Sequence, residues 1–312
     1  MLFLFRPCKE LIISLRFAAL AIAAAVVLGG CSAPRFIYNQ GPELAYWWLD
    51  GYADFDDEQA PRARSALASW FRWHRSTQLG DYAILLERAQ ADVLADTTPS
   101  RVCEWIDTVR DRFETAYEHA IPPLVDIAVG FTPAQIAHVE RRYAKANSEF
   151  RDDFLQDTRE ERLEASIARS TKRASKLYGK LDAAQREFIA HRLAASPFDA
   201  DLWYAERQAR QQDVINALKD LQAATKGSFQ ATGTASPTPV AQARVAFLGI
   251  GKHLRRSPRD AYQAYEDRFV QYNCEFMAQL HNSTSPAQRQ TAAARLRSWE
   301  EDLRALSGTA ER

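Results

Sequence analysis

The densest group of side chains that could do chemistry is a set of five carboxylates: Asp50, Asp54, Asp56, Asp57 and Glu58. Carboxylates could hold a divalent cation, but this spacing lacks the Asp-x-Asp-x-Asp-Gly ligands and the closing bidentate Glu of an EF-hand. Acidic side chains at the start of a helix also interact favourably with the helix dipole. We therefore expect the cluster to begin a helix, and the sequence predicts no metal site.

Histidine is the other residue type that could bind metal or transfer protons, and the chain has six. No two lie three or four residues apart, so no pair shares a helix face as in a His-x-x-x-His zinc site. His74 beside Trp73 and His281 beside Asn282 are the best candidates for a polar site, against the commoner alternative of a packed or surface histidine. No serine or cysteine stands in a recognisable nucleophile turn. The sequence thus predicts no catalytic residue, no cofactor and no enzymatic activity.

The run Gly249-Ile250-Gly251-Lys252 superficially suggests phosphate binding. It lacks the first glycine and the Ser or Thr of a P-loop, and no strand precedes it. We interpret it as a kink, or as a close helix contact, inside an apolar helix.

Cys31 has the clearest chemical role, because it closes the run Leu28-Gly29-Gly30-Cys31 after an apolar block. Three basic residues precede the block, so residues 1–30 have the charge, apolar core and small-residue cut site of a secretory signal. The run resembles the lipobox of bacterial lipoproteins. That resemblance implies cleavage before Cys31 and acylation of Cys31 with chains such as palmitate, and several such chains anchor a protein stably.

The alternative for this segment is an uncleaved membrane helix over residues 11–30. Arg16 interrupts the segment and leaves about 12 uninterrupted apolar residues, whereas a span needs about 20. Ser32 follows Cys31, where lipoproteins kept in the inner membrane typically carry Asp, so resemblance to that sorting rule implies the outer membrane. We expect a lipid-anchored protein on the periplasmic face of a Gram-negative outer membrane.

Cleavage before Cys31 would remove Cys8, and lipidation would use Cys31. The two cysteines that remain are Cys103 and Cys274. In an oxidising compartment a lone pair predicts a disulfide, although two buried thiols acting as small apolar residues are the alternative. Closing so long a loop would stabilise the fold by about 5 kcal/mol in the chain-entropy description. No Cys-x-x-Cys occurs, which argues against a redox activity.

Charge and composition limit the classes of fold and partner. Residues 1–30 contain three of the 40 basic and one of the 40 acidic residues. The chain after residue 30 therefore has 37 basic and 39 acidic residues. This balance predicts no nucleic-acid partner. Helix formers are common and no segment alternates apolar and polar residues, so we expect an all-α, multi-helix bundle or array. The expected organisation is a lipidated tether at 31–41 and one helical domain at 42–307, with a flexible loop at 226–239.

Apolar periodicity and start and stop signals divide this domain into helices. Ile121-Pro122-Pro123 is expected to end the helix before it, because proline disrupts a helix interior. Gly179 is expected to end another. A helix of about 24 residues is expected through Ile136 and Phe154, on the apolar spacing of that segment. The other predicted helices are 43–52, 56–76, 80–95, 99–120, 124–129, 159–178, 183–195, 200–224, 240–255, 259–281 and 286–306.

Four of the expected helix starts share one pattern, in which Asp, Thr or Ser stands three residues before Gln. This is the capping box: the first side chain accepts from a backbone N–H while the Gln side chain reaches back to the cap residue. Each cap stabilises its helix by about 1 kcal/mol. The four pairs are Asp56 with Gln59, Thr132 with Gln135, Asp182 with Gln185, and Ser285 with Gln288.

Two resemblances follow from these motifs. The boxes are similar to the Leu-Thr-x-x-Gln signature of Spy-type periplasmic proteins, small helical chaperones and sensors, although capping alone explains them. A likeness over most of the chain is to a family of uncharacterised proteobacterial lipoproteins, and it implies a helical, lipid-anchored domain without an established activity or catalytic residues. Beside the lipobox, it rests on Tyr38-Asn39, Trp47-Trp48-Leu49-Asp50, Asp54 to Gln59, Trp73-His74, His281-Asn282-Ser283 and Pro286-Ala287-Gln288-Arg289.

Trp47 and Trp48 lie close to the expected anchor, and adjacent tryptophans cannot share one helix face. One of them could rest at the lipid headgroups, where tryptophan is favoured, or both could be buried against the core.

For function we expect a non-catalytic binding, scaffold or chaperone-like role, with the membrane and an envelope protein or unfolded client as partners. The alternatives are a carrier of lipid or another apolar ligand, which requires a cavity between helices, and an envelope hydrolase, which requires two converging carboxylates.

Overall fold

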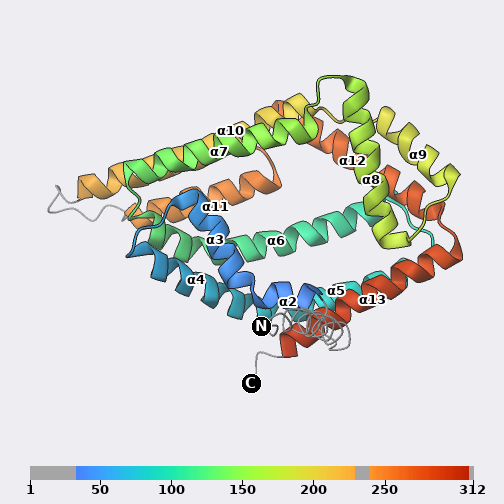
Figure 1. Cartoon of the computed structure of the whole chain (residues 1–312), viewed down its shortest axis with the longest axis horizontal. Helices are drawn as coiled ribbons and strands as arrows, with labels where there is room; N and C mark the ends of the chain where they lie inside the picture. The colour runs from blue at the N-terminus through green and yellow to red at the C-terminus, as the bar shows by residue number, and fades with distance from the viewer. Residues whose placement is uncertain (1–32, 229–238, 309–312) are drawn as a thin grey trace, which may run out of the picture. The chain divides into compact units, whose positions relative to one another are not determined.

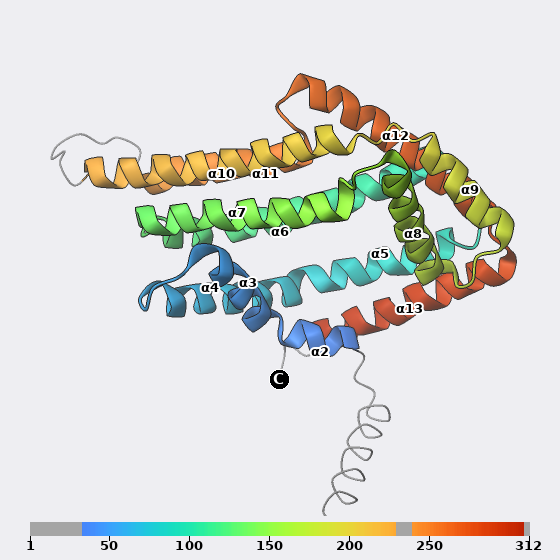
Figure 2. The same ribbon diagram turned by 45° about the horizontal axis from the view of Figure 1, so that its top comes forward.

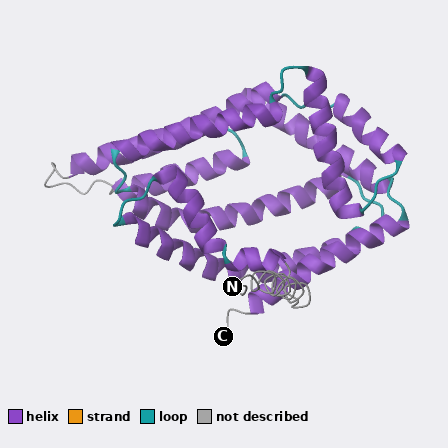
Figure 3. Ribbon diagram, viewed as in Figure 1, coloured by secondary structure: helices purple, strands orange, loops and turns teal. Residues whose placement is uncertain are grey.

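A computed structural model describes residues 33–228 and 239–308. Helices joined by short loops make up this part of the chain, and none of it forms a strand (Figure 3), so the all-α prediction is confirmed. The expected cleavage and lipidation at Cys31 lie outside the described residues. Among the described helices, none has both the length and the apolar character of a membrane span.

The residues Pro42–Arg312 form one compact unit, and Met1–Gly41, with α2 (Ala33–Asn39), forms another. The other described elements are α3 (Gly41–Ala53), α4 (Gln59–Trp73), the π-helical turn η1 (His74–Gln78), α5 (Leu79–Asp92), α6 (Pro99–Ala128), α7 (Pro133–Phe154), α8 (Arg159–Tyr178), α9 (Ala183–Ala194), α10 (Ala200–Ser228), α11 (Pro239–Arg255), α12 (Asp260–Asn282) and α13 (Pro286–Gly308).

The long helices of the larger unit pack in pairs. Helix α13 lies along α5, and α7 lies along α10, as both views show (Figures 1 and 2). Helix α6 contacts α4, α11 and α12, and α11 in turn contacts α10. The largest buried apolar cluster joins α6, α7, α10 and α11 through Ile121, Val125, Ile136, Ile215 and Phe247, among others.

Helix α6 is continuous through Pro122 and Pro123, so the expected break at residue 121 is wrong. Two adjacent prolines remove two helical N–H donors, a local penalty that the sequence shows clearly. The flanking residues Ile121 and Val125 are 2% and 0% exposed. Burying such side chains stabilises by about 1.5–3 kcal/mol each, which offsets the loss when the helix continues.

Three further boundaries differ from the expectation. The helices expected at 56–76 and 80–95 are joined without a gap, because the π-helical turn η1 links α4 to α5. Residues 226–228 belong to α10 instead of the expected loop, and Pro239 begins α11. The rest of that loop lies outside the described residues. The segment expected as a tether contains the helix α2.

All four expected capping boxes form both of their hydrogen bonds. Thr132 with Gln135 and Asp182 with Gln185 begin α7 and α9. Ser285 with Gln288 begins α13 through bonds of 3.2 and 2.9 Å. The Asp56 carboxylate accepts from the Gln59 N–H at 2.8 Å, and the Gln59 side chain accepts from the Asp56 N–H at 3.3 Å. The acidic cluster therefore begins a helix, as the sequence predicts.

The same glutamines also join the boxes to each other. The Gln135 amide donates to the Gln59 side-chain oxygen at 2.5 Å and to the Asp54 carbonyl at 2.9 Å. In return, the Gln59 amide donates to the Gly130 carbonyl at 3.0 Å. Asp54 has a positive φ of 52°, a left-handed conformation that Asp tolerates better than most residues. Each acceptor carbonyl lies two residues before the partner box's cap residue.

The second pair of boxes repeats this arrangement. The Gln185 and Gln288 side chains hydrogen-bond to each other at 2.8 Å. The Gln185 amide donates to the Ser283 carbonyl at 3.1 Å, and the Gln288 amide donates to the Lys180 carbonyl at 3.0 Å. Again each acceptor lies two residues before the partner's cap. The capping motif therefore fixes helix starts that are far apart in the sequence.

A disulfide joins Cys103 on α6 to Cys274 on α12, with a Cα–Cα distance of 5.5 Å and a sequence separation of 171. Cys274 is fully buried. The bridge covalently links the first half of the domain to its last third, across the α6–α12 contact.

Candidate functional site

A cavity of about 950 Å³ lies between α3, α4, α6, α7, α10 and α11. Its walls are mainly aromatic and aliphatic, and all of the residues that line it belong to the larger unit. The apolar lining includes Trp48, Leu49, Tyr52, Phe55, Leu67, Trp70, Phe71, Tyr117, Leu124, Ile127, Val139, Tyr143, Phe150, Trp203, Val214, Leu218, Phe247 and Ile250.

Tyr117 on α6 forms part of the wall because a glycine opposite leaves room for its ring. A Cβ atom added at Gly251 on α11 would lie 2.3 Å from the Tyr117 ring, which no real contact permits. The Tyr117 hydroxyl donates to the Phe247 carbonyl at 2.8 Å, and burial raises the pKa of this phenol to about 12. The glycine run thus provides the close helix contact that the sequence suggested. Tyr117 stays neutral at physiological pH.

Stacked rings on α7 and α10 form a second part of the wall. The ring centroid of Phe150 lies 5.1 Å from that of Trp203 and 5.6 Å from that of Tyr204. Tyr52 on α3 lies 5.9 Å from Tyr143 on α7. Rings in such offset and edge-on arrangements hold each other in place, so this wall is preformed.

The charged residues among those lining the cavity are Glu206, Arg207 and Arg210, all from α10. The Glu206 side chain is 2% exposed and accepts from the Arg210 Nε at 2.7 Å. It also lies 3.3 Å from the Nη1 of Arg259, which pairs in turn with Asp213 at 2.9 Å. This carboxylate is therefore shared between two guanidinium groups.

Arg207 is held by neutral groups. Its Nε donates to the Asn147 side-chain oxygen at 2.9 Å, and its guanidinium lies 5.2 Å from the centre of the Phe150 ring. Asn147 is itself fixed by two hydrogen bonds with Gln211, at 2.7 and 3.0 Å. Within the described chain, none of the ion pairs includes Arg207.

Arg210 lines the cavity and has a buried donor without a partner among the described residues. Its Nε bonds Glu206 and its guanidinium lies 5.5 Å from the Tyr262 ring centre, but its Nη2 is buried and has no hydrogen-bond partner among the described residues. A buried polar group without a partner destabilises a fold by about 1–3 kcal/mol, and more if it is charged. Such a group calls for an explanation, and an acceptor supplied by a ligand is one.

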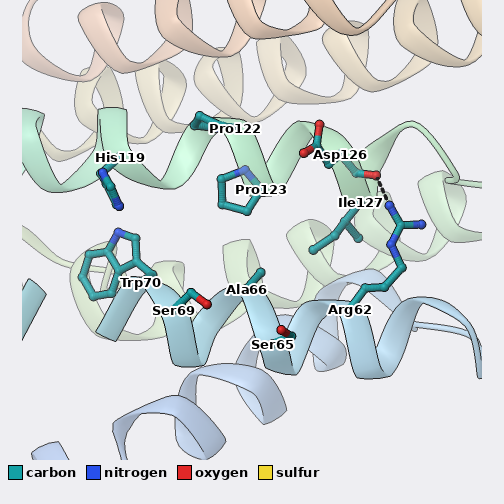
Figure 4. Close-up of a pocket in the computed structure, with 10 residues that line it drawn as sticks. All are labelled: Arg62, Ser65, Ala66, Ser69, Trp70, His119, Pro122, Pro123, Asp126 and Ile127. Carbon is teal, nitrogen blue, oxygen red and sulfur yellow. Dashed lines mark hydrogen bonds between the residues drawn. The ribbon is translucent and has the colours of Figure 1, made fainter. Parts of the chain in front are cut away.

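A smaller hollow of about 560 Å³ lies between α4 and α6 (Figure 4). Arg62 on α4 closes one side of it by donating to the Asp126 carbonyl on α6 at 2.8 Å. Trp70 and His119 face each other at another part of the hollow (Figure 4). Both hollows lie against the same α4–α6 seam, because they share the lining residues Ala66, Trp70, Pro123 and Ile127.

The two histidines singled out by sequence lie away from the cavity lining. The His74 ring stacks on Trp70 at 4.7 Å, and burial lowers its pKa below the usual 6.5. His281 bridges two segments: its Nε2 donates to the Ala95 carbonyl at 2.7 Å and its Nδ1 bonds the Tyr178 hydroxyl at 2.9 Å. Both positions are explained by packing and hydrogen bonding.

Trp47 and Trp48 are 65% and 64% exposed, so burial of both against the core is wrong. Their neighbour Tyr46 is 6% exposed and takes the core position of α3. Trp48 also lines the cavity, which places an exposed tryptophan at its rim. Contact of these two tryptophans with a membrane stays a prediction.

Sequence reasoning missed Arg207 and Arg210, the cationic side chains of the cavity. The signal was weak, because charged residues on a long helix are usually solvated. The neighbouring Trp203 and Tyr204 show that this stretch of α10 mixes aromatic and charged side chains, but not that they line a hollow.

Among the described residues, no three His, Cys, Asp or Glu side chains are grouped so that they could hold a metal ion.

A family model matches residues 51–230, which is more than half of the chain, and the family is described as one of unknown function (DUF6279). The match spans the helices that carry Arg207 and Arg210 and most of the cavity walls. No curated protein and no solved structure matches the chain.

Proposed function

The chain belongs to this family of unknown function, and from that premise we propose that it is an envelope lipoprotein whose helical domain binds an apolar or amphiphilic ligand. The observation that supports the proposal is the cavity of about 950 Å³ between its helices. That volume lies at the upper end of the roughly 300–1,000 Å³ typical of small-molecule sites. It suits an acyl chain or a lipid.

The lining explains why the ligand would be apolar. Transfer of each methylene from water into such surroundings is worth about 0.8 kcal/mol, so a long chain gains several kcal/mol from burial. The aromatic residues on α7 and α10 already stack on each other, so little ordering is needed on binding. A few polar groups from α10 would orient the ligand.

The same cavity bears on the rival functions. An envelope hydrolase needs an acid and a base that reach the reacting bond, whereas Glu206 is the one carboxylate among the lining residues and is held by Arg210 and Arg259. A chaperone-like role would use a broad surface for an unfolded chain. A hollow lined by six helices favours a small ligand instead.

Membrane attachment would give this site access to lipids. We propose that the acylated Cys31 lies in the outer membrane and that Trp48 lies at the headgroup level. Because Trp48 is both exposed and part of the cavity lining, a lipid chain leaving the bilayer beside it would meet the cavity rim. The membrane is then both the anchor and the source of the ligand.

The neutral fluorescent probe N-phenyl-1-naphthylamine tests the proposal directly. The purified full-length protein should enhance its fluorescence saturably. Val214→Trp places a large ring on the cavity wall and should abolish the saturable signal. Asp220→Trp, on the exposed face of the same helix, is the matched control and should bind normally. If the unmodified protein gives no saturable enhancement, the proposed function is wrong.

A further inference from the structure

We infer that the ligand is an anionic amphiphile, whose single acidic headgroup is bound by Arg207 and Arg210 while its chain fills the apolar cavity. The inference rests on the proposed function and specifies the chemistry of its ligand. It concerns carboxylate and phosphate headgroups, which a guanidinium binds by the same charge-assisted hydrogen bonds.

Arg207 differs from the other guanidinium groups of this cluster because it has no carboxylate partner among the described residues. Glu206 and Asp213 pair with Arg210 and Arg259. Arg207 has the Asn147 amide and the Phe150 ring instead. A single anionic headgroup would therefore give Arg207 a partner of opposite charge at this end of the cavity.

A neighbouring carboxylate, Glu266, also interacts with Arg210. It lies 3.8 Å from Arg110, which pairs with Asp107 at 3.5 Å as well, so the wider group of charges is balanced. Desolvation raises the pKa of Glu266. Among the described residues none of these carboxylates pairs with Arg207, which is therefore the guanidinium that an anionic ligand would meet in the cavity.

Hydrogen-bonding capacity points to the same ligand. The Arg210 Nη2 is buried without an acceptor, and Arg207 uses its Nε on Asn147. A carboxylate or phosphate has at least two acceptor oxygens and no need of a donor, so it can take N–H groups from both arginines. A hydroxyl headgroup can accept hydrogen bonds but leaves Arg207 without a partner of opposite charge. A choline headgroup would add a cation to the cluster.

The two arginines are pre-positioned for this role. Glu206 fixes Arg210 through its Nε, and the Asn147–Gln211 pair fixes Arg207. Arginine is protonated throughout the physiological pH range, so binding would depend on the charge of the ligand headgroup rather than on titration of these side chains.

Competition against N-phenyl-1-naphthylamine separates the headgroup from the chain. Palmitic acid and hexadecanol have the same chain length and differ in headgroup charge. The full-length protein should bind the acid at least about tenfold more tightly than the alcohol, as expected for hydrogen bonds to a charged group. Arg207→Gln and Arg210→Gln should each reduce this ratio towards one, and the affinity of each variant for the neutral probe is measured alongside. Arg141→Gln, an exposed arginine on α7, is the control and should change neither.

The outcomes distinguish this inference from the function on which it rests. Equal displacement by acid and alcohol, with normal probe binding, overturns the anionic headgroup but keeps an apolar-ligand protein. Absence of probe binding overturns the proposed function itself. A variant that loses both probe affinity and thermal stability is replaced by Arg207→Lys, which keeps the charge and should retain part of the preference for the acid.

A mixture then identifies the source of the headgroup. The protein is offered equal amounts of palmitic acid, dipalmitoyl phosphatidic acid and dipalmitoylglycerol, and bound mass is read by native mass spectrometry. Retention of either acid supports the inference and tells a fatty acid from a phospholipid. Retention of the neutral diacylglycerol at the same level, or of none of the three while the probe binds, contradicts it.

Discussion

The side chains of Gln185 and Gln288 hydrogen-bond to each other, and each donates to the backbone two residues before the other's cap residue. Gln59 and Gln135 repeat the arrangement at the start of α4 and α7. A local capping motif thus becomes a tertiary contact. The two pairs hold turns together that are 76 and 103 residues apart in the chain.

Replacing Gln135 should therefore destabilise the fold more than the loss of one cap. Gln135→Ala removes the reach-back bond to Thr132 and leaves the Asp54 carbonyl without its donor, for an expected loss of about 2–3 kcal/mol. Thr158 and Glu161 form a similar, exposed capping box at the start of α8. Glu161→Ala removes this cap without a tertiary hydrogen bond and should lower the free energy of unfolding by about 1 kcal/mol or less. Urea unfolding of both variants measures the difference. Equal losses would show that the link between boxes adds nothing.

The two glycines of α11 should respond oppositely to alanine. Gly251→Ala forces a methyl group into the Tyr117 ring, so it should lower stability by about 1–3 kcal/mol and weaken probe binding at the cavity. Gly249 has open space around its Cβ position, and Gly249→Ala should stabilise the helix by up to about 1 kcal/mol. Thermal unfolding and probe titration of the pair check this. Normal probe binding by a folded Gly251→Ala variant would show that the Tyr117 ring does not contribute to the binding site.

The disulfide should contribute a large part of the stability. Cys103→Ser with Cys274→Ser removes a crosslink between residues 171 apart, which chain-entropy reasoning values at about 5 kcal/mol. Denaturant unfolding of the double variant should resemble that of the reduced native protein. If reduction leaves the unfolding midpoint unchanged, the bridge is absent or contributes no stability.

His74 should make stability depend on pH in mildly acidic solution. Burial lowers its pKa below 6.5, so the unfolded chain binds a proton more readily than the folded one. The contribution of neutral His74 to the free energy of unfolding is complete above pH 6.5 and declines as the pH falls below that value. His74→Phe keeps a ring against Trp70 and should remove this part of the pH dependence. The test compares unfolding free energies at pH 7.5 and pH 5 for both proteins, and parallel changes would rule His74 out as the cause.

Much of the fold could be predicted because its signals are local. The Thr158 cap and Gly179, with its positive φ of 81°, set the ends of α8 at the predicted residues. The break expected at Pro122 did not occur, because the burial of Ile121 and Val125 outweighs a local preference. Tertiary packing decides such cases, and it cannot be derived from apolar spacing along one helix.

The candidate site was harder to predict than the fold. Arg207 and Arg210 stand on α10 like the charged residues of any solvated helix face. Their contacts with Asn147 on α7 and with the Tyr262 ring on α12 arise from tertiary packing, which the sequence of α10 does not show. A cavity exists where several helices fail to fill the space between them, which depends on their arrangement and not on a motif.

Quenching of tryptophan fluorescence by a brominated fatty acid is the most direct test of the central claim, that an anionic amphiphile occupies the cavity. Trp48, Trp70 and Trp203 line the cavity, so 9,10-dibromostearate should quench the full-length protein saturably. Val214→Phe, which narrows the cavity without adding a tryptophan, and Arg207→Gln should weaken the saturable quenching. Quenching that rises linearly with concentration, or that is unchanged in both variants, would contradict the account.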